Sequence, residues 1–290
     1  MSYTEKIKTE LSEYKEQKYP HLANGEYTYK GKTDYYHHIL PKICGELNLI
    51  ETFRNDFLES DLSKIKFHQY FHHLNSSQAM CINFFFPLFI KQKLDIILKK
   101  FKLDNEVVNY VSVKFEKESN IDDKKQIREK IPELKQNQTI PTSFDFYFET
   151  QSGIKFYFEI KYTENEFGCA KKDKNSKDYE NKYKLKYERI YEEAAKGKII
   201  SNDETSFLSQ YQIMRNLIHV DDNSYVVFVI PEKNERVYSQ ATTANKFVVE
   251  GYEKHVKVLT WDSLYKLIDN QNFDCNLKKH FDEFKQKYKL

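Results

Sequence analysis

Alternating apolar and polar positions mark two neighbouring segments near the middle of the chain. Phenylalanine or isoleucine occupies every even position of segments 144–148 and 156–161, whereas Asp145, Glu159 and Lys161 occupy odd positions. A period of two is typical of β-strands that have one apolar and one polar face. We therefore expect two strands whose even face packs on the core and whose odd face carries the chemistry.

The break between these segments predicts how the two strands pair. It spans residues 151–153 and ends in Gly153, which can adopt the left-handed conformation that a tight hairpin loop requires. The resulting register places Asp145 opposite Glu159. Because like charges that face each other across a sheet repel, this pairing predicts that a cation lies between the two carboxylates.

The apolar pattern elsewhere predicts a core of helix, three strands, helix and strand. A long apolar stretch over 79–101 follows the N-cap candidates Ser76 and Ser77 and predicts a helix that Pro87 kinks or ends. The further expected core elements are a strand over 107–115, the hairpin, a helix over 206–218 and a buried strand over 225–230. This αβββαβ order predicts an α/β fold with a mixed central sheet.

Helical additions are expected at both ends of this core. Charged, helix-prone residues predict a surface helix over 3–18, and apolar residues at helical spacing predict two helical pieces within 35–58. Near the other end, the pattern predicts a strand within 247–259 and amphipathic helices over 263–290. We expect a single domain over 1–290, in which residues 1–75 form an N-terminal helical addition, 76–235 the core, and 236–290 a C-terminal strand and helices.

Composition and charge narrow the classes of function. Aromatic residues make up 16% of the 290 residues and glycine and proline are few, which favours a packed core over disorder. The formal net charge is +2, so nucleic-acid binding would have to come from local patches and not from an overall basic surface. This near-neutral charge argues against a histone-like coating protein.

Several other chemistries receive no support from the sequence. The four cysteines form no Cys-X-X-Cys pair, which argues against a zinc site. No apolar run reaches the ~20 residues needed to cross a bilayer, and Gly197-Lys198 lacks the partner glycine of a phosphate-binding loop. The polar N-terminus lacks the apolar run of a secretion signal. We therefore expect a cytoplasmic protein without membrane association or a nucleotide cofactor.

Asp145 and the later Glu159-Ile160-Lys161 resemble the Asp and Glu-X-Lys signature of the PD-(D/E)XK restriction-endonuclease-like superfamily. The wider segments 141–145 and 158–168 resemble a bacterial, restriction-endonuclease-type branch of that superfamily. The resemblance extends more loosely to 76–88 and 211–216, so that it covers roughly the middle half of the chain. Phe144 stands where the superfamily usually has a proline before the first acid.

The resemblance implies a nuclease core over 76–235 and a magnesium-dependent phosphodiesterase that acts on DNA. Asp145, Glu159 and the Ile160 carbonyl would hold Mg²⁺, for which Mn²⁺ would substitute, and Lys161 would assist the attacking water. Supporting roles are expected for a second set of residues, which are Gln78, Glu164, Gln212 and Arg215. Each of these also has a purely structural interpretation, such as helix capping for Gln78 or a solvated acid for Glu164.

A lysine-rich insertion over 169–202 follows the second strand of the hairpin. Runs of charge are commonly solvated surface, but this position favours a basic flap that grips phosphates, with Tyr179, Tyr183 and Tyr187 stacking on bases. The lysines expected to contact nucleic acid are Lys171, Lys172, Lys174 and Lys177.

The resemblance implies an endonuclease that takes part in restriction or defence against foreign DNA. The expected substrate is double-stranded DNA, and a homodimer is expected because one site per chain cuts one strand. The main alternative is a catalytically inactive nucleic-acid-binding or protein-interaction module on the same fold, and a second alternative is a nuclease directed at RNA.

Overall fold

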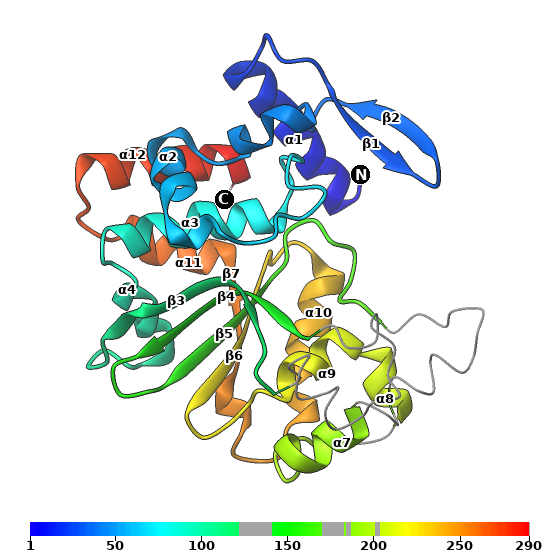
Figure 1. Cartoon of the computed structure of the whole chain (residues 1–290), viewed down its shortest axis with the longest axis vertical. Helices are drawn as coiled ribbons and strands as arrows, with labels where there is room; N and C mark the ends of the chain where they lie inside the picture. Colours follow the sequence, from blue (N-terminus) through cyan, green and yellow to red (C-terminus); the bar gives the residue numbers. More distant parts are fainter. Residues whose placement is uncertain (122–140, 170–182, 184–186, 201–203, 290) are drawn as a thin grey trace.

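The structure is a computed structural model of the chain, and it describes residues 1–121, 141–169, 183, 187–200 and 204–289. Five strands form one sheet in the order β3-β4-β5-β6-β7 (Figure 1). Their bounds are Val108–Glu118, Ser143–Thr150, Lys155–Ile160, Ser224–Ile230 and Val256–Thr260. Strands β3 to β5 pair antiparallel and β5 to β7 pair parallel. The predicted α/β fold with a mixed central sheet is confirmed.

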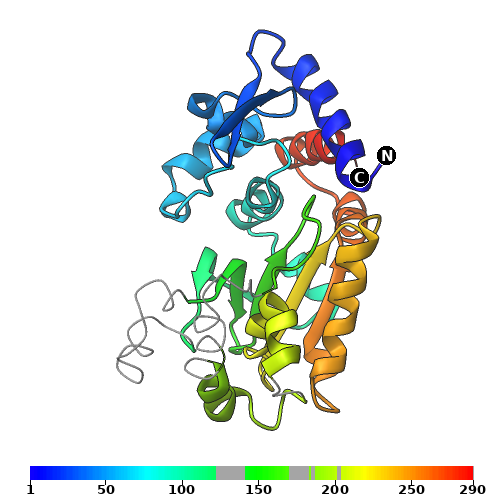
Figure 2. The same ribbon diagram turned by 90° about the vertical axis from the view of Figure 1, so that its right-hand side faces the viewer.

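Helices cover both faces of this sheet, as the two views in Figures 1 and 2 show. One layer comprises α1 (Tyr3–Lys18), α2 (Glu51–Glu59), α3 (Ser77–Ile90), α4 (Asp95–Leu98), α11 (Trp261–Asp269) and α12 (Cys275–Tyr288). The opposite layer comprises α7 (Glu188–Ile190), α8 (Glu204–Ser209), α9 (Tyr211–Leu217) and α10 (Glu235–Thr243). A single π-turn, Tyr191–Ala195, follows α7. Short 3₁₀ turns occupy Lys42–Asn48, Asp61–Ser63, Lys99–Phe101, Ala244–Phe247 and Glu253–His255.

The prediction that one face of the hairpin is left for chemistry is wrong, because helical layers cover both faces of the sheet. Towards α3, Phe85 stacks on Phe146 with ring centroids 4.1 Å apart. Towards α9, Phe228 of the neighbouring β6 is fully buried and packs edge-on against Phe167. Parallel strands such as β6 and β7 are covered on both faces because their connections lie above and below the sheet. Glu159 of β5 and the following Lys161 are therefore buried at one end of the sheet.

The helix predicted over 79–101 is shorter than expected. The Ser76 hydroxyl caps the start of α3 by accepting from the Ala79 N–H at 3.3 Å, as predicted. Pro87 has no N–H to donate to the carbonyl of Asn83, and that carbonyl instead accepts from His280 Nε2 at 2.7 Å. The helix ends one turn later, and α4 and a 3₁₀ turn make up the rest of the segment.

Two other predicted elements have different bounds in the structure, and one further helix was not predicted. The helix expected over 206–218 is broken at Gln210 into α8 and α9, and only the last residues of segment 247–259 form a strand, β7. The helix α10 was not predicted. Within the described residues, no helix has both the length and the apolar character needed to span a bilayer.

A second, two-stranded sheet in the N-terminal part was also not predicted. Strands β1 (Gly25–Tyr29) and β2 (Lys32–Tyr36) form an antiparallel hairpin. Its loop residues, Lys30 and Gly31, both have positive φ, at 50° and 79°. These values are typical of a type I′ turn, the connection favoured in two-residue hairpins. In Figure 1 this hairpin projects beside α1, above the five-stranded sheet.

Candidate active site

The three residues of the predicted site lie together where β4 and β5 stop pairing. Their pairing runs from Glu149 and Lys155 to Phe146 and Phe158. One more step in this register places Asp145 opposite Glu159, which is the pairing that the turn predicts. Lys161 directly follows β5, so all three side chains belong to one end of the sheet.

The carboxylate of Asp145 is held against the backbone of β5. The Lys161 N–H donates to the Val229 carbonyl of β6, so the N–H of the preceding Ile160 points the other way, towards β4. There it donates to Asp145 Oδ2 at 2.6 Å. Among the described residues, no hydrogen bond reaches the second oxygen, Oδ1. Asp145 thus presents one free oxygen at the end of the hairpin.

Three donors fix the buried carboxylate of Glu159. Lys161 Nζ and Gln212 Nε2 donate to Oε1 at 2.7 and 2.6 Å. Asn216 Nδ2 donates to Oε2 at 3.2 Å. Gln212 and Asn216 lie four residues apart on α9 and so share one face of that helix. The sequence analysis identified Gln212 but missed Asn216, although the spacing of this pair could have shown it.

Lys161 is a buried ammonium group enclosed by acidic and aromatic side chains. Besides its ion pair with Glu159, its Nζ lies 5.3 Å from the centroid of the Phe167 ring. Burial opposes the charge, but the carboxylates of Glu159, Glu164 and Asp145 outweigh burial and raise the pKa of Lys161 above its ordinary value. At neutral pH this residue is therefore a fixed positive charge and not a base.

The backbone of Lys161 is fixed by a residue from the C-terminal part of the chain. Trp261, which is fully buried at the start of α11, donates its indole Nε1–H to the Lys161 carbonyl at 3.0 Å. A buried indole N–H needs such a partner. The hydrogen bond therefore holds the end of β5 in place against the helical layer.

A further carboxylate, that of Glu116, lies near the site, and the sequence analysis did not identify it. Gln78 Nε2 donates to Glu116 Oε1 at 2.7 Å, and the Ser143 hydroxyl donates to Oε2 at 3.3 Å. Gln78 thus orients Glu116, whereas the sequence analysis expected it to support Lys161 or a metal-bound water. Glu116 has φ of 50°, which is uncommon and strained for a residue with a side chain. The strand predicted from the sequence stops at residue 115, so the sequence analysis did not place Glu116 on the sheet or at the site.

Among the described residues at this end of the sheet, carboxylates outnumber cationic groups. Burial raises the pKa of Asp145 well above its ordinary value, and the charges of Glu159 and Glu116 raise it further. The Lys161 charge and the Ile160 N–H act in the opposite direction but do not offset burial. Burial raises the pKa of Glu116 as well. A bound cation would favour the ionised forms of these carboxyl groups.

The donor atoms at the site fit magnesium better than zinc. Within the part of the chain that the structure describes, no three His, Cys, Asp or Glu side chains converge to hold a metal ion. Zinc takes three or four protein side chains. Magnesium prefers hard oxygen donors, is usually held by one or two carboxylates, and takes its other ligands from water and phosphate. The free oxygen of Asp145, the carboxylate of Glu159 and the Ile160 carbonyl match this requirement.

Two other sequence candidates have structural partners of their own. Glu164 Oε2 accepts from the Tyr162 N–H at 2.6 Å, which folds the carboxylate back on the segment after β5. Arg215 Nε donates to the Thr142 hydroxyl at 3.1 Å, and its guanidinium lies 5.3 Å from the centroid of the Tyr211 ring. The structure thus places Glu164 close to Lys161 and Arg215 against the segment that leads into β4.

Only part of the predicted basic flap lies within the described residues. Lys171, Lys172, Lys174, Lys177 and Tyr179 lie outside the described residues. Tyr183 and Tyr187 are buried and pack on Phe207, with ring centroids 5.5 and 4.8 Å away. The prediction that these two tyrosines stack on bases is therefore wrong, since both rings belong to the core beneath α8 and α9.

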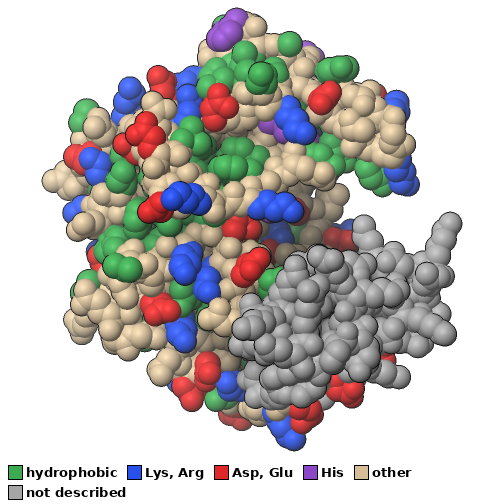
Figure 3. Space-filling view, in the orientation of Figure 1, with side chains coloured by type: hydrophobic (Ala, Val, Ile, Leu, Met, Phe, Trp, Pro, Cys, Tyr) green, Lys and Arg blue, Asp and Glu red, His purple; other side chains and the backbone are tan. Residues whose placement is uncertain are grey.

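A hollow opens beside the candidate site, between the N-terminal elements and the end of β5. It has a volume of about 220 Å³, and its walls include His68, Ser76, Ser77, Thr163 and Glu164. In the space-filling view of Figure 3 the surface is visibly indented between the upper and lower parts of the molecule. Thr163 and Glu164 directly follow the Lys161 segment, so this hollow gives access to the polar end of the sheet.

Comparison with known proteins supports the resemblance seen in the sequence. No curated protein and no solved structure matches the chain. The model of one protein family, described as restriction endonuclease associating with ARP, matches residues 4–289. This match includes every element of the fold and the whole candidate site, and it confirms the predicted restriction-endonuclease-like family. The chain therefore belongs to the family of restriction endonucleases associating with ARP.

Proposed function

We propose that this protein is a magnesium-dependent nuclease that hydrolyses phosphodiester bonds in double-stranded DNA, acting in restriction or defence. The observation that carries the proposal is the placement of Asp145, with one oxygen free, opposite the buried pair of Glu159 and Lys161. The family to which the chain belongs supports a nuclease-like role. The excess of carboxylates supports the binding of a divalent cation.

Each residue has a distinct role in this proposal. Asp145, Glu159 and the Ile160 carbonyl hold the metal, with Mn²⁺ able to substitute for Mg²⁺. When bound, the metal supplies Lewis-acid stabilisation of the charge that develops on the phosphate. Lys161, as a fixed ammonium group, orients the attacking water and stabilises the same charge. Gln212 and Asn216 keep the Glu159 carboxylate in position.

The proposal is tested by incubating supercoiled plasmid with the purified protein. We expect nicked circles, followed by linear DNA, with Mg²⁺ or Mn²⁺ and intact plasmid with a chelator. Linear product that rises more steeply than in proportion to protein concentration would indicate that two copies act together on the two strands. Intact plasmid under all metals, or cleavage that the chelator does not stop, would contradict the proposal.

Gln212→Leu is expected to lower the cleavage rate by about 10- to 100-fold, as is usual when a residue that orients a metal ligand is removed. The Gln212 amide nitrogen donates to Glu159, and the amide oxygen accepts from the Gly168 N–H at 3.1 Å. The measurement is the initial nicking rate at several magnesium concentrations. Gln286→Leu, an exposed position on α12, serves as the matched control, and equal rates for both variants would exclude this role.

One observation favours the alternative of an inactive nucleic-acid-binding module. The Glu159 carboxylate already has three donors, and one of them is the Lys161 ammonium at 2.7 Å. A closed ion pair of this kind can serve the stability of the fold alone. The plasmid assay separates the two functions, because the module would bind DNA without cutting it under any metal.

A further inference from the structure

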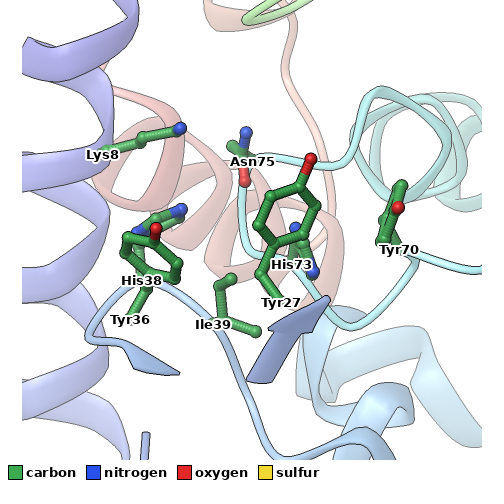
Figure 4. Close-up of a pocket in the computed structure, with 8 residues that line it drawn as sticks. All are labelled: Lys8, Tyr27, Tyr36, His38, Ile39, Tyr70, His73 and Asn75. Atoms are coloured by element: carbon green, nitrogen blue, oxygen red, sulfur yellow. The ribbon is translucent and has the colours of Figure 1, made fainter. Parts of the chain in front are cut away.

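A second cavity lies between the N-terminal hairpin, α1 and the loop before α3. It has a volume of about 260 Å³. Figure 4 shows Tyr27 of β1 in its centre, with Tyr36 on one side and Tyr70 on the other, while Lys8 reaches in from α1. The cavity is thus lined by tyrosines and contains one cationic side chain. Nothing in the proposed cleavage chemistry uses these residues.

Two residues in the walls of this cavity each have a buried polar atom with no partner among the described residues. His73 is 8% exposed, and its Nε2 makes no hydrogen bond. The same is true of Asn75 Oδ1. Leaving a buried polar atom unpaired costs about 1–3 kcal/mol, and each such atom needs an explanation. A ligand with hydrogen-bonding groups would bring polar partners to the wall that contains both atoms.

The imidazole of His73 is neutral in this position. Burial, together with the nearby charges of His72, His38 and Lys8, lowers the pKa of His73 to about 3. A neutral imidazole has one N–H donor and one acceptor nitrogen, and the tautomer can adjust to its partner. The Asn75 amide likewise offers an acceptor oxygen beside a donor nitrogen. The cavity therefore suits a planar ligand with donors and acceptors along one edge.

The aromatic rings of the cavity are arranged as a wall with an open side. The Tyr27 ring lies 5.4 Å from Tyr70 and 5.7 Å from His73, both measured between centroids. Tyr36 lies 6.3 Å from Tyr27 and is 39% exposed. An exposed tyrosine beside packed ones is a suitable surface for a flat aromatic ligand.

The cavity is connected to the candidate active site. Tyr70, His73 and Asn75 also line the hollow that contains Thr163 and Glu164. Asn75 Nδ2 donates to the Thr163 hydroxyl at 2.8 Å. Thr163 lies two residues beyond Lys161, so the shared wall leads from the tyrosine-lined cavity towards the segment that carries Lys161.

We propose that this cavity, defined by Tyr27, Tyr36, Tyr70, His73 and Asn75, binds an unpaired nucleobase of the DNA that the protein acts on. The proposal rests on the proposed function, since it takes DNA as the ligand. The base stacks on the tyrosines and pairs its polar edge with His73 and Asn75, as enzymes that hold an extrahelical base do. Lys8 contributes the positive charge that an adjoining phosphate requires.

The test compares two fluorescently labelled duplexes, one fully paired and one with a single bulged adenine. Binding is measured by anisotropy in the presence of a chelator, so that cleavage plays no part. We expect the bulged duplex to bind about tenfold more tightly to the wild-type protein, because base–aromatic stacking is worth this much or more. Tyr27→Ala and Tyr70→Ala should each remove the preference.

Two further variants show whether a lost preference results from the missing ring or from loss of folding. Tyr27→Phe keeps the ring and should keep the preference. Tyr35→Ala removes a tyrosine that is 67% exposed on the neighbouring strand but does not line the cavity, and it should behave as wild type. Equal binding of both duplexes by the wild-type protein would overturn the proposal, as would a preference that survives Tyr27→Ala and Tyr70→Ala.

The duplex-binding test gives its result whether or not the protein cuts DNA. A Tyr27-dependent preference for the bulged duplex together with an intact plasmid under all metals would reject the nuclease and retain the base-binding cavity. Plasmid cleavage without any preference for the bulge would retain the nuclease and reject the cavity.

Discussion

Asp145→Asn is expected to lower the rate of plasmid cleavage at least about a thousandfold, which is the scale on which active-site electrostatics act, while leaving the protein folded. The amide oxygen of asparagine can still accept from the Ile160 N–H, so the end of the hairpin keeps its geometry. What is lost is the negative charge that attracts the cation. Glu118→Gln, an exposed acid at the end of β3, is the matched control and should cleave as wild type.

The same substitution is expected to stabilise the metal-free protein at neutral pH. Because burial and the charges of Glu159 and Glu116 raise the pKa of Asp145 in the folded state, the folded protein binds this proton more tightly than the unfolded chain does. The contribution of Asp145 to stability is therefore full below its ordinary pKa and is lost as the pH rises towards the folded-state pKa. Asparagine does not ionise, so it removes this loss, with a gain of about 0.5–2 kcal/mol.

Thermal unfolding with and without magnesium measures both effects. The wild-type midpoint should rise when Mg²⁺ is added, because a ligand that binds only the folded state stabilises it. The Asp145→Asn midpoint should start higher and respond little to Mg²⁺. A variant that is less stable than wild type without metal, or that gains as much from Mg²⁺, would show that Asp145 does not hold the ion.

Lys161→Met is expected to abolish cleavage and also to destabilise the protein by about 3–5 kcal/mol, because it leaves the buried Glu159 carboxylate without its cation. Cleavage should fall by about 100-fold or more, since a charge that stabilises the developing phosphate charge is removed. Urea unfolding reports the stability, and plasmid nicking below the unfolding transition reports the activity. Lys155→Met, at the exposed opposite end of β5, should change stability by no more than about 0.5 kcal/mol.

The double variant Lys161→Met with Glu159→Gln separates the structural role of the ion pair from its chemical role. Replacing the unpaired carboxylate with an amide should recover most of the lost stability. Cleavage should stay absent, because both the ammonium group and a metal ligand are missing. A double variant that regains cleavage would refute the assignment of these two residues, whatever its stability.

The parts of the fold that the sequence predicted are those governed by local periodicity. The hairpin of β4 and β5 follows from alternation, the strand β6 from a short apolar run, and the helix α1 from a segment of charged, helix-prone residues. Gly153 adopts φ of 92° in the hairpin loop, as the turn requires. The same register places Asp145 opposite Glu159, so the central part of the candidate site could be predicted as well.

What the sequence could not predict depends on contacts between distant segments. Gln78, in the first turn of α3, donates to Glu116 of β3, and Trp261, at the start of α11, donates to the Lys161 carbonyl after β5. The burial of Tyr187 depends in a similar way on α8. Such contacts leave no periodic pattern in a single sequence.

The hydrogen bond from Trp261 to the Lys161 carbonyl bears on when the candidate site takes its final form during synthesis of the chain. A nascent chain that has emerged only as far as β6 contains Asp145, Glu159 and Lys161 but lacks the indole that fixes the last of them, because Trp261 follows β6 in the sequence. Under the proposed function, a nascent chain would not cut DNA before α11 has folded against the end of β5.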